Sequence, residues 1–206
     1  MKHEYKKHEK ELYGTKDKPA LLDVPQQKYI CIKGEGNPNG EDFKKRVEAL
    51  YSLAYTIRMS HKNGFAPDDY FEYTVYPLEG LWDKKNYDSD ELHLDDLVYT
   101  IMIRQPEFVD EAMFNKAIEV ARNKKRIELL SEVYFDVMTD GLSVQMLHIG
   151  PFATEGETFS VMQEFVENND LHIKTLVHRE IYLSDPRKVT GDRLKTLLRY
   201  RVEENK

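Results

Sequence analysis

The chain has 206 residues, of which 40% are hydrophobic and 33% are charged, and its formal net charge is -7 at pH 7. This length is enough to bury a sizeable core, either in one large domain or in two small halves. The acidic balance and the lack of a basic tract argue against a nucleic-acid-binding footprint and mildly favour cationic partners. No apolar run approaches the roughly 18 residues that a membrane span needs.

Cysteine content and the amino-terminal residues bear on the compartment. Cys31 is the only cysteine, which excludes an internal disulfide and suits a reducing environment. The stretch Met1 to Lys10 is rich in Lys, His and Glu without an apolar segment, so it does not read as a secretory signal. Both observations predict a cytoplasmic protein.

Hydrophobic periodicity places the elements of the first part of the chain. A polar arm or frayed helix is expected up to Lys18, and a charged loop over Lys84–Asp96. The pattern also predicts one long amphipathic helix, Glu41–Asn63, and three strands, which are Lys28–Lys33, Tyr70–Leu78 and Leu97–Arg104.

The second part of the chain continues with helical and alternating patterns. A long helix is expected over Glu107–Leu130, with the basic cluster Arg122 to Arg126 near its end read as a solvated face rather than as a binding patch. The remaining predicted elements are a hairpin of Glu132–Met138 and Leu142–Ile149 about a Thr-Asp-Gly turn, a helix over Glu155–Asn168, and two last strands over Leu171–Leu183 and Lys195–Val202.

The segment His178 to Arg187 carries the most informative pattern. Because strand side chains alternate between faces, His178, Glu180 and Tyr182 are predicted to share one face, while Arg179 and Ile181 lie on the other. An acid flanked on its own face by an imidazole and a phenol suits a concave site better than a dry core. A solvent-facing strand followed by a turn remains the alternative.

The order of elements contains an internal pseudo-repeat. Strand, Gly/Pro loop, helix, Glu-containing strand and last strand occur over Lys28–Gln105 and again over Leu142–Val202. This order predicts an α+β protein with antiparallel sheets. The chain is expected to form a single domain over 1–206, with one half at about 19–106, a connecting helix at about 107–130 and a second half at about 132–202. A two-fold relation of the halves would bring Glu79 and Glu180 to one crevice from opposite sides.

Four blocks, in order, resemble the stand-alone GyrI-like small-molecule-binding proteins. They are Leu78-Glu-Gly-Leu-Trp82, Gln145-Met-Leu-His-Ile-Gly-Pro151, Glu180-Ile-Tyr-Leu-Ser-Asp-Pro-Arg187 and Lys195-Thr-Leu-Leu-Arg199. The resemblance covers about Lys10 to Val202. It implies two strand-helix-strand-strand modules with a central ligand cleft between them.

The resemblance also implies a class of ligand. The same fold forms the effector-binding domain of multidrug-sensing transcription regulators, where an acid in an aromatic cleft receives lipophilic cations, and Glu180 matches the strand of that acid. Some stand-alone members hydrolyse the cyclopropane ring of DNA-alkylating natural products, which protects the cell. Related members often carry a second tryptophan after the one that matches Trp82, whereas this chain has Asp83, which weakens the expected aromatic enclosure.

Two functions stay open on the residues. In the first, the protein binds bulky aromatic or cationic lipophilic molecules without turnover; in the second, it is a hydrolase in which Glu180 and Tyr182 are catalytic. The expected partners are such small molecules, without direct nucleic-acid binding and without membrane insertion. The residues expected to contact the ligand are Tyr51, Tyr55, Tyr73, Glu79, Trp82, Tyr134, Met146, His148, Phe152 and His178.

Other chemistries fit the sequence poorly. No Gly-x-Ser-x-Gly elbow is present, and Cys31 lies in a strand without a local histidine, so covalent nucleophilic catalysis is not expected. His148, His172 and His178 fall in no recognised ligand motif. We therefore expect neither a metal nor another cofactor.

Overall fold

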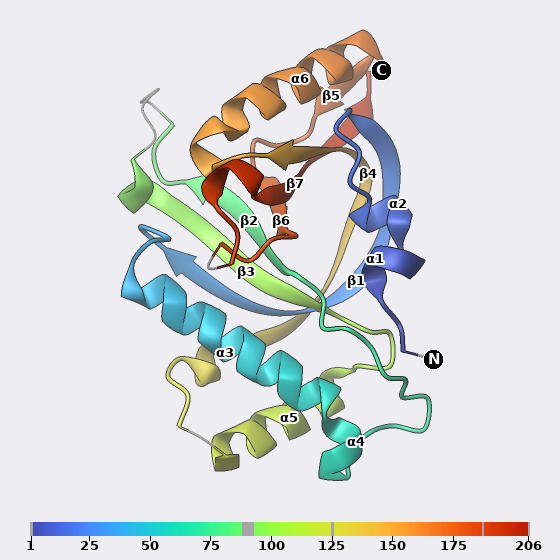
Figure 1. Ribbon diagram of the computed structural model, residues 1–206, viewed down its shortest axis with the longest axis vertical. Coiled ribbons are helices and arrows are strands. Elements are labelled where there is room, and N and C mark those ends of the chain that lie inside the picture. The colour runs from blue at the N-terminus through green and yellow to red at the C-terminus, as the bar shows by residue number, and fades with distance from the viewer. Residues whose placement is uncertain (1, 88–92, 125, 187, 206) are drawn as a thin grey trace. The chain divides into compact units, whose positions relative to one another are not determined.

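The computed structural model describes residues 2–87, 93–124, 126–186 and 188–205 (Figure 1). Parts of the predicted charged loop, the basic cluster and the block ending at Arg187 therefore fall outside the described residues. The helices are α1 (Tyr5–His8), α2 (Lys10–Tyr13), α3 (Glu41–Arg58), α4 (Ser60–Asn63), α5 (Glu111–Lys124) and α6 (Glu155–Asn168). The strands are β1 (Ala20–Glu35), β2 (Leu78–Lys84), β3 (Leu97–Gln105), β4 (Tyr134–Ile149), β5 (Leu171–Ile173), β6 (His178–Tyr182) and β7 (Lys195–Glu204).

The chain divides into two compact units, each built from separate stretches of sequence. The first unit comprises 1–5, 27–76 and 84–138, and the second comprises 6–26, 77–83 and 139–206. The long strands β1 and β4 each contribute residues to both units.

The first unit is built on an antiparallel pair of strands with helices packed on it. In this pair Lys28 of β1 lies opposite Gln105 of β3. Helix α3 contacts both β3 and α5, and it buries one stripe of side chains, namely Ala49, Leu50, Leu53, Ala54, Thr56 and Ile57. The stripe follows the 3.6-residue period of the sequence, so its burial is the main source of stability of this helix.

The second unit has β6 in the interior of an antiparallel sheet. β6 pairs with β2 on one side and with β7 on the other, and β7 pairs further with β4 and β5. Helix α6 contacts β5, and the core between helix and strands contains Val144, Met162, Val166, Leu171, Leu198, Tyr200 and Val202. Because both edges of β6 are paired, its register and the facing of its side chains are tightly set.

The structure confirms the α+β class with antiparallel strands. The helix predicted over Glu155–Asn168 is α6, with the same bounds. The strand predicted over Leu97–Arg104 is β3, one residue longer. The long amphipathic helix is present as α3 followed by the short α4, which ends at Asn63 and is capped by Gly64, whose left-handed φ of 72° suits glycine.

The strand predicted over Tyr70–Leu78 is wrong. Only Tyr73 forms a bridge, with His3, and the regular strand β2 begins at Leu78. The rings of Phe71 and Tyr73 pack against Phe108, at centroid distances of 5.1 and 6.0 Å. The alternation thus arises from ring packing, which a period of two does not distinguish from a hydrogen-bonded ladder.

The hairpin predicted about Thr-Asp-Gly is also wrong, because β4 runs through it without a turn. Gly141 takes the positive φ of 66° that the sequence pattern requires, but it does so within the strand. The neighbouring Asp140 is held by two arginines and does not form a turn. The single strand predicted over Leu171–Leu183 is instead divided into β5 and β6.

Candidate functional site

Strand β6 of the second unit brings His178, Glu180 and Tyr182 to one face, as its alternation predicts. The carboxylate of Glu180 is contacted from both sides: His178 Nε2 lies 3.1 Å from Oε1, and the Tyr182 hydroxyl donates to Oε2 at 2.8 Å. Glu180 is 8% exposed. Its two oxygens are therefore held by its own neighbours on the strand, which orients the carboxylate without a cation.

Trp82 extends this hydrogen-bond chain from the adjacent strand. Its indole N–H donates to the Tyr182 hydroxyl at 2.7 Å, so the donors run from Trp82 through Tyr182 to Glu180 and each polarises the next. The pairing of Gly80 with Glu180 makes room for the indole, because a Cβ on Gly80 would lie 2.5 Å from the Trp82 Nε1. Burial, followed by the charge of Glu180 and its hydrogen bond, raises the pKa of Tyr182 well above its ordinary value, which keeps its hydroxyl proton in place.

Glu155 joins the site as the first residue of α6, a position that the sequence pattern does not single out. It is 7% exposed, and its Oε1 has no hydrogen-bond partner among the described residues. Burial, followed by the charge of Glu180 and a side-chain hydrogen bond with it, raises the pKa of Glu155 to about 9. Two neighbouring carboxyl groups disfavour double ionisation, so Glu155 keeps its proton at neutral pH.

The sequence offered no signal for this pairing. An acid in the first turn of a helix is common, because it complements the helix dipole and the free N–H groups there. Glu157 of the same turn is acidic as well but is exposed. Only the packing of α6 distinguishes the two.

His148 positions the start of α6. It is buried, its Nε2 lies 3.1 Å from the Pro151 carbonyl oxygen, and its Nδ1 lies 2.9 Å from the Thr158 hydroxyl. Because a carbonyl only accepts hydrogen bonds, Nε2 is the donor to Pro151, and the Thr158 hydroxyl can pair with Nδ1 as donor or as acceptor. Both ring nitrogens are thus bound to protein groups, and His148 ties β4 to the turn and helix that carry Phe152 and Glu155 rather than offering a nitrogen to a ligand.

Three rings from other elements contact the two ring side chains that hold Glu180. Phe152, which is 45% exposed, meets Tyr182 edge-on at a centroid distance of 5.9 Å. Phe159 and Tyr200 lie 4.7 and 6.0 Å from the His178 ring. Of the predicted ring residues, the structure therefore brings together Trp82, Phe152 and Tyr182 and adds Phe159 and Tyr200, which the sequence analysis missed.

Five other predicted ligand contacts are divided between the units, four in the first and one in the second. Tyr51, Tyr55, Tyr73 and Tyr134 belong to the first unit, and their contact with a ligand stays a prediction. Tyr55 is exposed and its ring lies 6.4 Å from that of Tyr51, whereas Tyr73 is fully buried. Met146 packs against the hydrophobic core of the second unit.

Glu79 departs from the expectation that it shares a crevice with Glu180. It lies opposite Ile181 in the strand register, so its side chain points to the other face of the sheet. There its Oε2 accepts a hydrogen bond from Arg179 Nη1 at 2.9 Å, with both side chains almost completely buried. The expectation failed because it assumed a symmetry of the halves, whereas direct pairing of β2 with β6 sets the facing by the pleat.

Arg179 belongs to a closed network on that second face. Its Nε and Nη2 both donate to Asp140, at 2.8 and 2.9 Å, and Arg199 donates to Asp140 at 3.1 Å and to Gln145 at 2.7 Å. Burial opposes ionisation of Asp140, but the two arginines prevail and lower its pKa. The face of β6 opposite Glu180 thus carries a buried arginine whose charge is neutralised.

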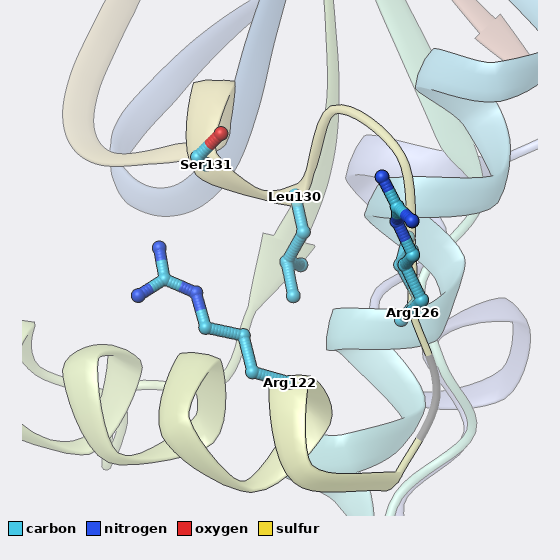
Figure 2. Close-up of a pocket in the computed structure, with 5 residues that line it drawn as sticks. Arg122, Arg126, Leu130 and Ser131 are labelled. Carbon is cyan, nitrogen blue, oxygen red and sulfur yellow. The ribbon is translucent and has the colours of Figure 1, made fainter.

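A separate hollow of about 240 Å³ lies in the first unit (Figure 2). Arg122, Arg126, Ile127, Leu130 and Ser131 line it. The two arginines lie on either side of Leu130 and are exposed, as a solvated face would be. None of the residues predicted to bind a ligand lines this hollow.

Within the described residues, no group of three or more His, Cys, Asp or Glu side chains is arranged to hold a metal ion. No helix in the same part of the chain is long and apolar enough to cross a membrane.

Comparison with known families gives a match over most of the chain. The sequence model described as "GyrI-like small molecule binding domain" matches residues 17–203. None of the curated proteins compared with the chain matched it.

Solved structures show the same fold. An uncharacterised conserved protein from Listeria innocua is 40% identical, with a TM-score of 0.91, and the match covers 98% of this chain and 100% of that one. A protein from the same organism that is described as a hydrolase is 39% identical, with the same TM-score and coverage. The C-terminal domain of EcmrR is similar in fold alone, at 14% identity and a TM-score of 0.54 over 91% of this chain and 98% of that one.

Proposed function

Because the chain belongs to the GyrI-like family of small-molecule-binding domains, we propose that its second unit binds bulky, flat, aromatic or cationic lipophilic molecules beside Glu180. The observation that carries this proposal is an oriented carboxylate with no ion-pairing Lys or Arg among the described residues, bordered by aromatic rings. A cationic ligand supplies the missing positive charge. The rings of Phe152 and Tyr182 offer faces and edges to an aromatic one.

The energetics favour a broad range of ligands over a single tight one. Each contact of a cation with a ring contributes about 0.5 to 2 kcal/mol, and it depends little on the shape of the rest of the molecule. The carboxylate adds a charge-assisted interaction that needs no rearrangement, because Tyr182 and His178 already hold it in place. Ligand charge and flatness, rather than a specific hydrogen-bond pattern, are therefore expected to govern affinity.

The binding test compares two ligands that differ in charge. Ethidium is a flat aromatic cation, and the phenanthridine that lacks its quaternary ethyl group is uncharged in mildly alkaline buffer. Glu180→Gln keeps the shape and is expected to weaken ethidium roughly tenfold, which corresponds to about 1.4 kcal/mol, while leaving the uncharged compound within about threefold. Fluorescence titration measures both affinities.

The matched control is Glu157→Gln, which removes an exposed acid of α6. Equal ethidium affinity in wild type and Glu180→Gln would refute the role of Glu180.

A second candidate function is hydrolysis of the cyclopropane ring of DNA-alkylating natural products, with cellular protection as its consequence. Two observations favour it: burial and the charge of Glu180 raise the pKa of Glu155, which keeps this acid protonated beside Glu180 at neutral pH, and a protein described as a hydrolase is 39% identical over nearly the whole chain. Glu180 would accept a proton from the attacking water, and Tyr182 would orient Glu180 through their hydrogen bond.

Product analysis tests this candidate. The protein is incubated with an electrophilic cyclopropane-bearing compound, and the ring-opened product is followed by mass spectrometry. We expect a rate above buffer that falls by about 100-fold to 10,000-fold in Glu180→Gln, the usual contribution of a general base. A rate equal to that of buffer would refute hydrolysis of that compound without touching the binding proposal.

A further inference from the structure

We propose that Glu155 is the proton donor of the site and that it exchanges its proton with Glu180 across the hydrogen bond between the two carboxyl groups. This inference deepens the hydrolase candidate and rests on it for the catalytic step. The paired state of the two acids does not depend on turnover, and it can be tested with any cationic ligand.

The surroundings of the pair require a proton there. Two buried carboxylates need a cation or a proton between them, and among the described residues no lysine or arginine forms an ion pair with either. The titratable groups around the pair are Tyr182 and His178 on β6, both of which bond Glu180 and not Glu155. His148 on β4 is bound to Thr158 and Pro151. The proton therefore resides between the two glutamates.

Glu155 has the free capacity that a donor needs. Its Oε1 is buried with no partner among the described residues, while Glu180 has a neighbour on each oxygen. A buried polar atom without a partner costs about 1–3 kcal/mol, and a ligand atom that approaches it would recover that cost. The unpartnered oxygen thus marks the position at which a ligand acceptor, such as a carbonyl oxygen, would receive the one O–H of Glu155 in place of Glu180.

Tyr182 is a weaker acid than Glu155 in this arrangement. Its hydroxyl proton is bound to Glu180, and its pKa lies well above the ordinary tyrosine value, whereas burial and Glu180 raise the pKa of Glu155 only to about 9. Proton transfer at neutral pH is most effective from a group whose pKa lies nearest to that pH. Glu155 is consequently the donor, and Tyr182 is a positioning residue.

Ring opening then proceeds with a complete proton balance. The substrate class is a cyclopropane conjugated to a carbonyl group. The water oxygen bonds to a ring carbon as the ring C–C bond breaks, and the electron pair of that bond moves to the carbonyl oxygen. That oxygen takes the proton of Glu155, while the water proton passes to Glu180. The products are an alcohol and an enol or phenol, and no oxidant or reductant is needed.

The hydrogen bond between the acids resets the site. After the reaction Glu180 is protonated and Glu155 is ionised, the reverse of the resting state. Transfer of the proton from Glu180 back to Glu155 restores the starting arrangement without exchange with solvent. Contact between the two acids therefore matters, because the proton that Glu180 receives in each turnover can pass directly to Glu155.

Glu155→Gln tests the catalytic step, because the amide imitates the neutral carboxyl but cannot give up a proton. Turnover is expected to fall at least 100-fold, while the uncharged phenanthridine binds within about threefold of wild type. Glu157→Gln is the matched control and should retain wild-type turnover. Wild-type turnover in Glu155→Gln would overturn the assignment, whereas absence of turnover in the wild type would instead count against the hydrolase candidate.

A binding measurement tests the shared proton independently of turnover. Ethidium keeps its charge over the whole range, so its affinity for wild type is expected to rise several-fold as the pH passes about 9 and the pair gains its second negative charge. In Glu155→Gln this rise should vanish. An equal rise in both proteins would overturn the proposal.

Infrared spectroscopy of the unmodified protein completes the test, because it needs no variant to fold. At neutral pH a protonated carboxylic acid should give a carbonyl stretching band that is lost as the pH passes about 9. If the wild type has no such band at neutral pH, both glutamates are ionised and the proposal is wrong.

Discussion

The two faces of strand β6 carry similar residues in opposite states. On the Arg179 face, two arginines meet two acids, and each charged group has a partner of opposite sign. On the Glu180 face, two acids meet each other without an arginine or lysine among the described residues, and one carboxyl oxygen lacks a partner. The comparison teaches that burial of charge alone does not mark a functional site. What marks it is burial that the protein itself leaves uncompensated.

The largest effect is expected from breaking the compensated face. Arg179→Met removes the cation that Glu79 and Asp140 bind and leaves both acids buried. Removal of one partner from a buried network typically costs about 3 to 5 kcal/mol of stability. The midpoint of urea denaturation should fall accordingly. Arg201→Met is the control, since Arg201 lies exposed on β7 and its loss should change stability by less than about 0.5 kcal/mol. A variant Arg179→Met as stable as wild type would contradict the assignment of this face to stability.

On the Glu180 face, we expect that replacing an acid by its amide raises the free energy of unfolding instead of lowering it. Glu155 has a folded-state pKa of about 9 against an unfolded value of 4.5, so the folded state binds the proton more tightly. Its stabilising contribution is fully present below pH 4.5, and it is lost as the pH rises towards 9. Glu155→Gln removes this loss and should be more stable than wild type by roughly 1 to 3 kcal/mol in mildly alkaline buffer.

Denaturation curves at several pH values measure that effect. The difference between Glu155→Gln and wild type should shrink as the pH falls towards 4.5, where both side chains are neutral. If the variant is less stable than wild type at every pH, the unpartnered acid is not a source of strain in the folded state.

A smaller effect is expected from disturbing the aromatic wall. Gly80→Ala places a Cβ 2.5 Å from the Trp82 Nε1, so the indole must shift away from Tyr182. We expect a loss of roughly 1 kcal/mol, the lower end of overpacking costs, and a weaker ethidium affinity. Trp82 is the only tryptophan, so a change in its emission reports the shift directly.

The control for this variant is Gly156→Ala. Gly156 lies in α6, and a Cβ there would meet no atom within 4 Å. Because alanine favours helix, this change should leave stability equal or slightly raised. Unchanged Trp82 emission in Gly80→Ala would show that the glycine does not hold the indole in place.

Local patterns were sufficient for the part of the site that lies on one strand. Side chains two residues apart share a face whatever surrounds the strand, so His178, Glu180 and Tyr182 were placed together by alternation alone. The bounds of α6 likewise follow from its own period and from Gly150-Pro151 before it. The family resemblance rested on short blocks of sequence in a set order, and the match over 17–203 confirms it.

Tertiary structure decided which distant residues complete the site. The sequence alone does not determine the register of β2 against β6. That register places Glu79 beside Arg179 and Trp82 beside Tyr182. The sequence alone also does not determine how α6 packs, which buries Glu155, and not its neighbour Glu157, beside Glu180. Both depend on contacts between segments far apart in the chain, and such contacts are set by packing and burial in three dimensions, which a one-dimensional period does not encode.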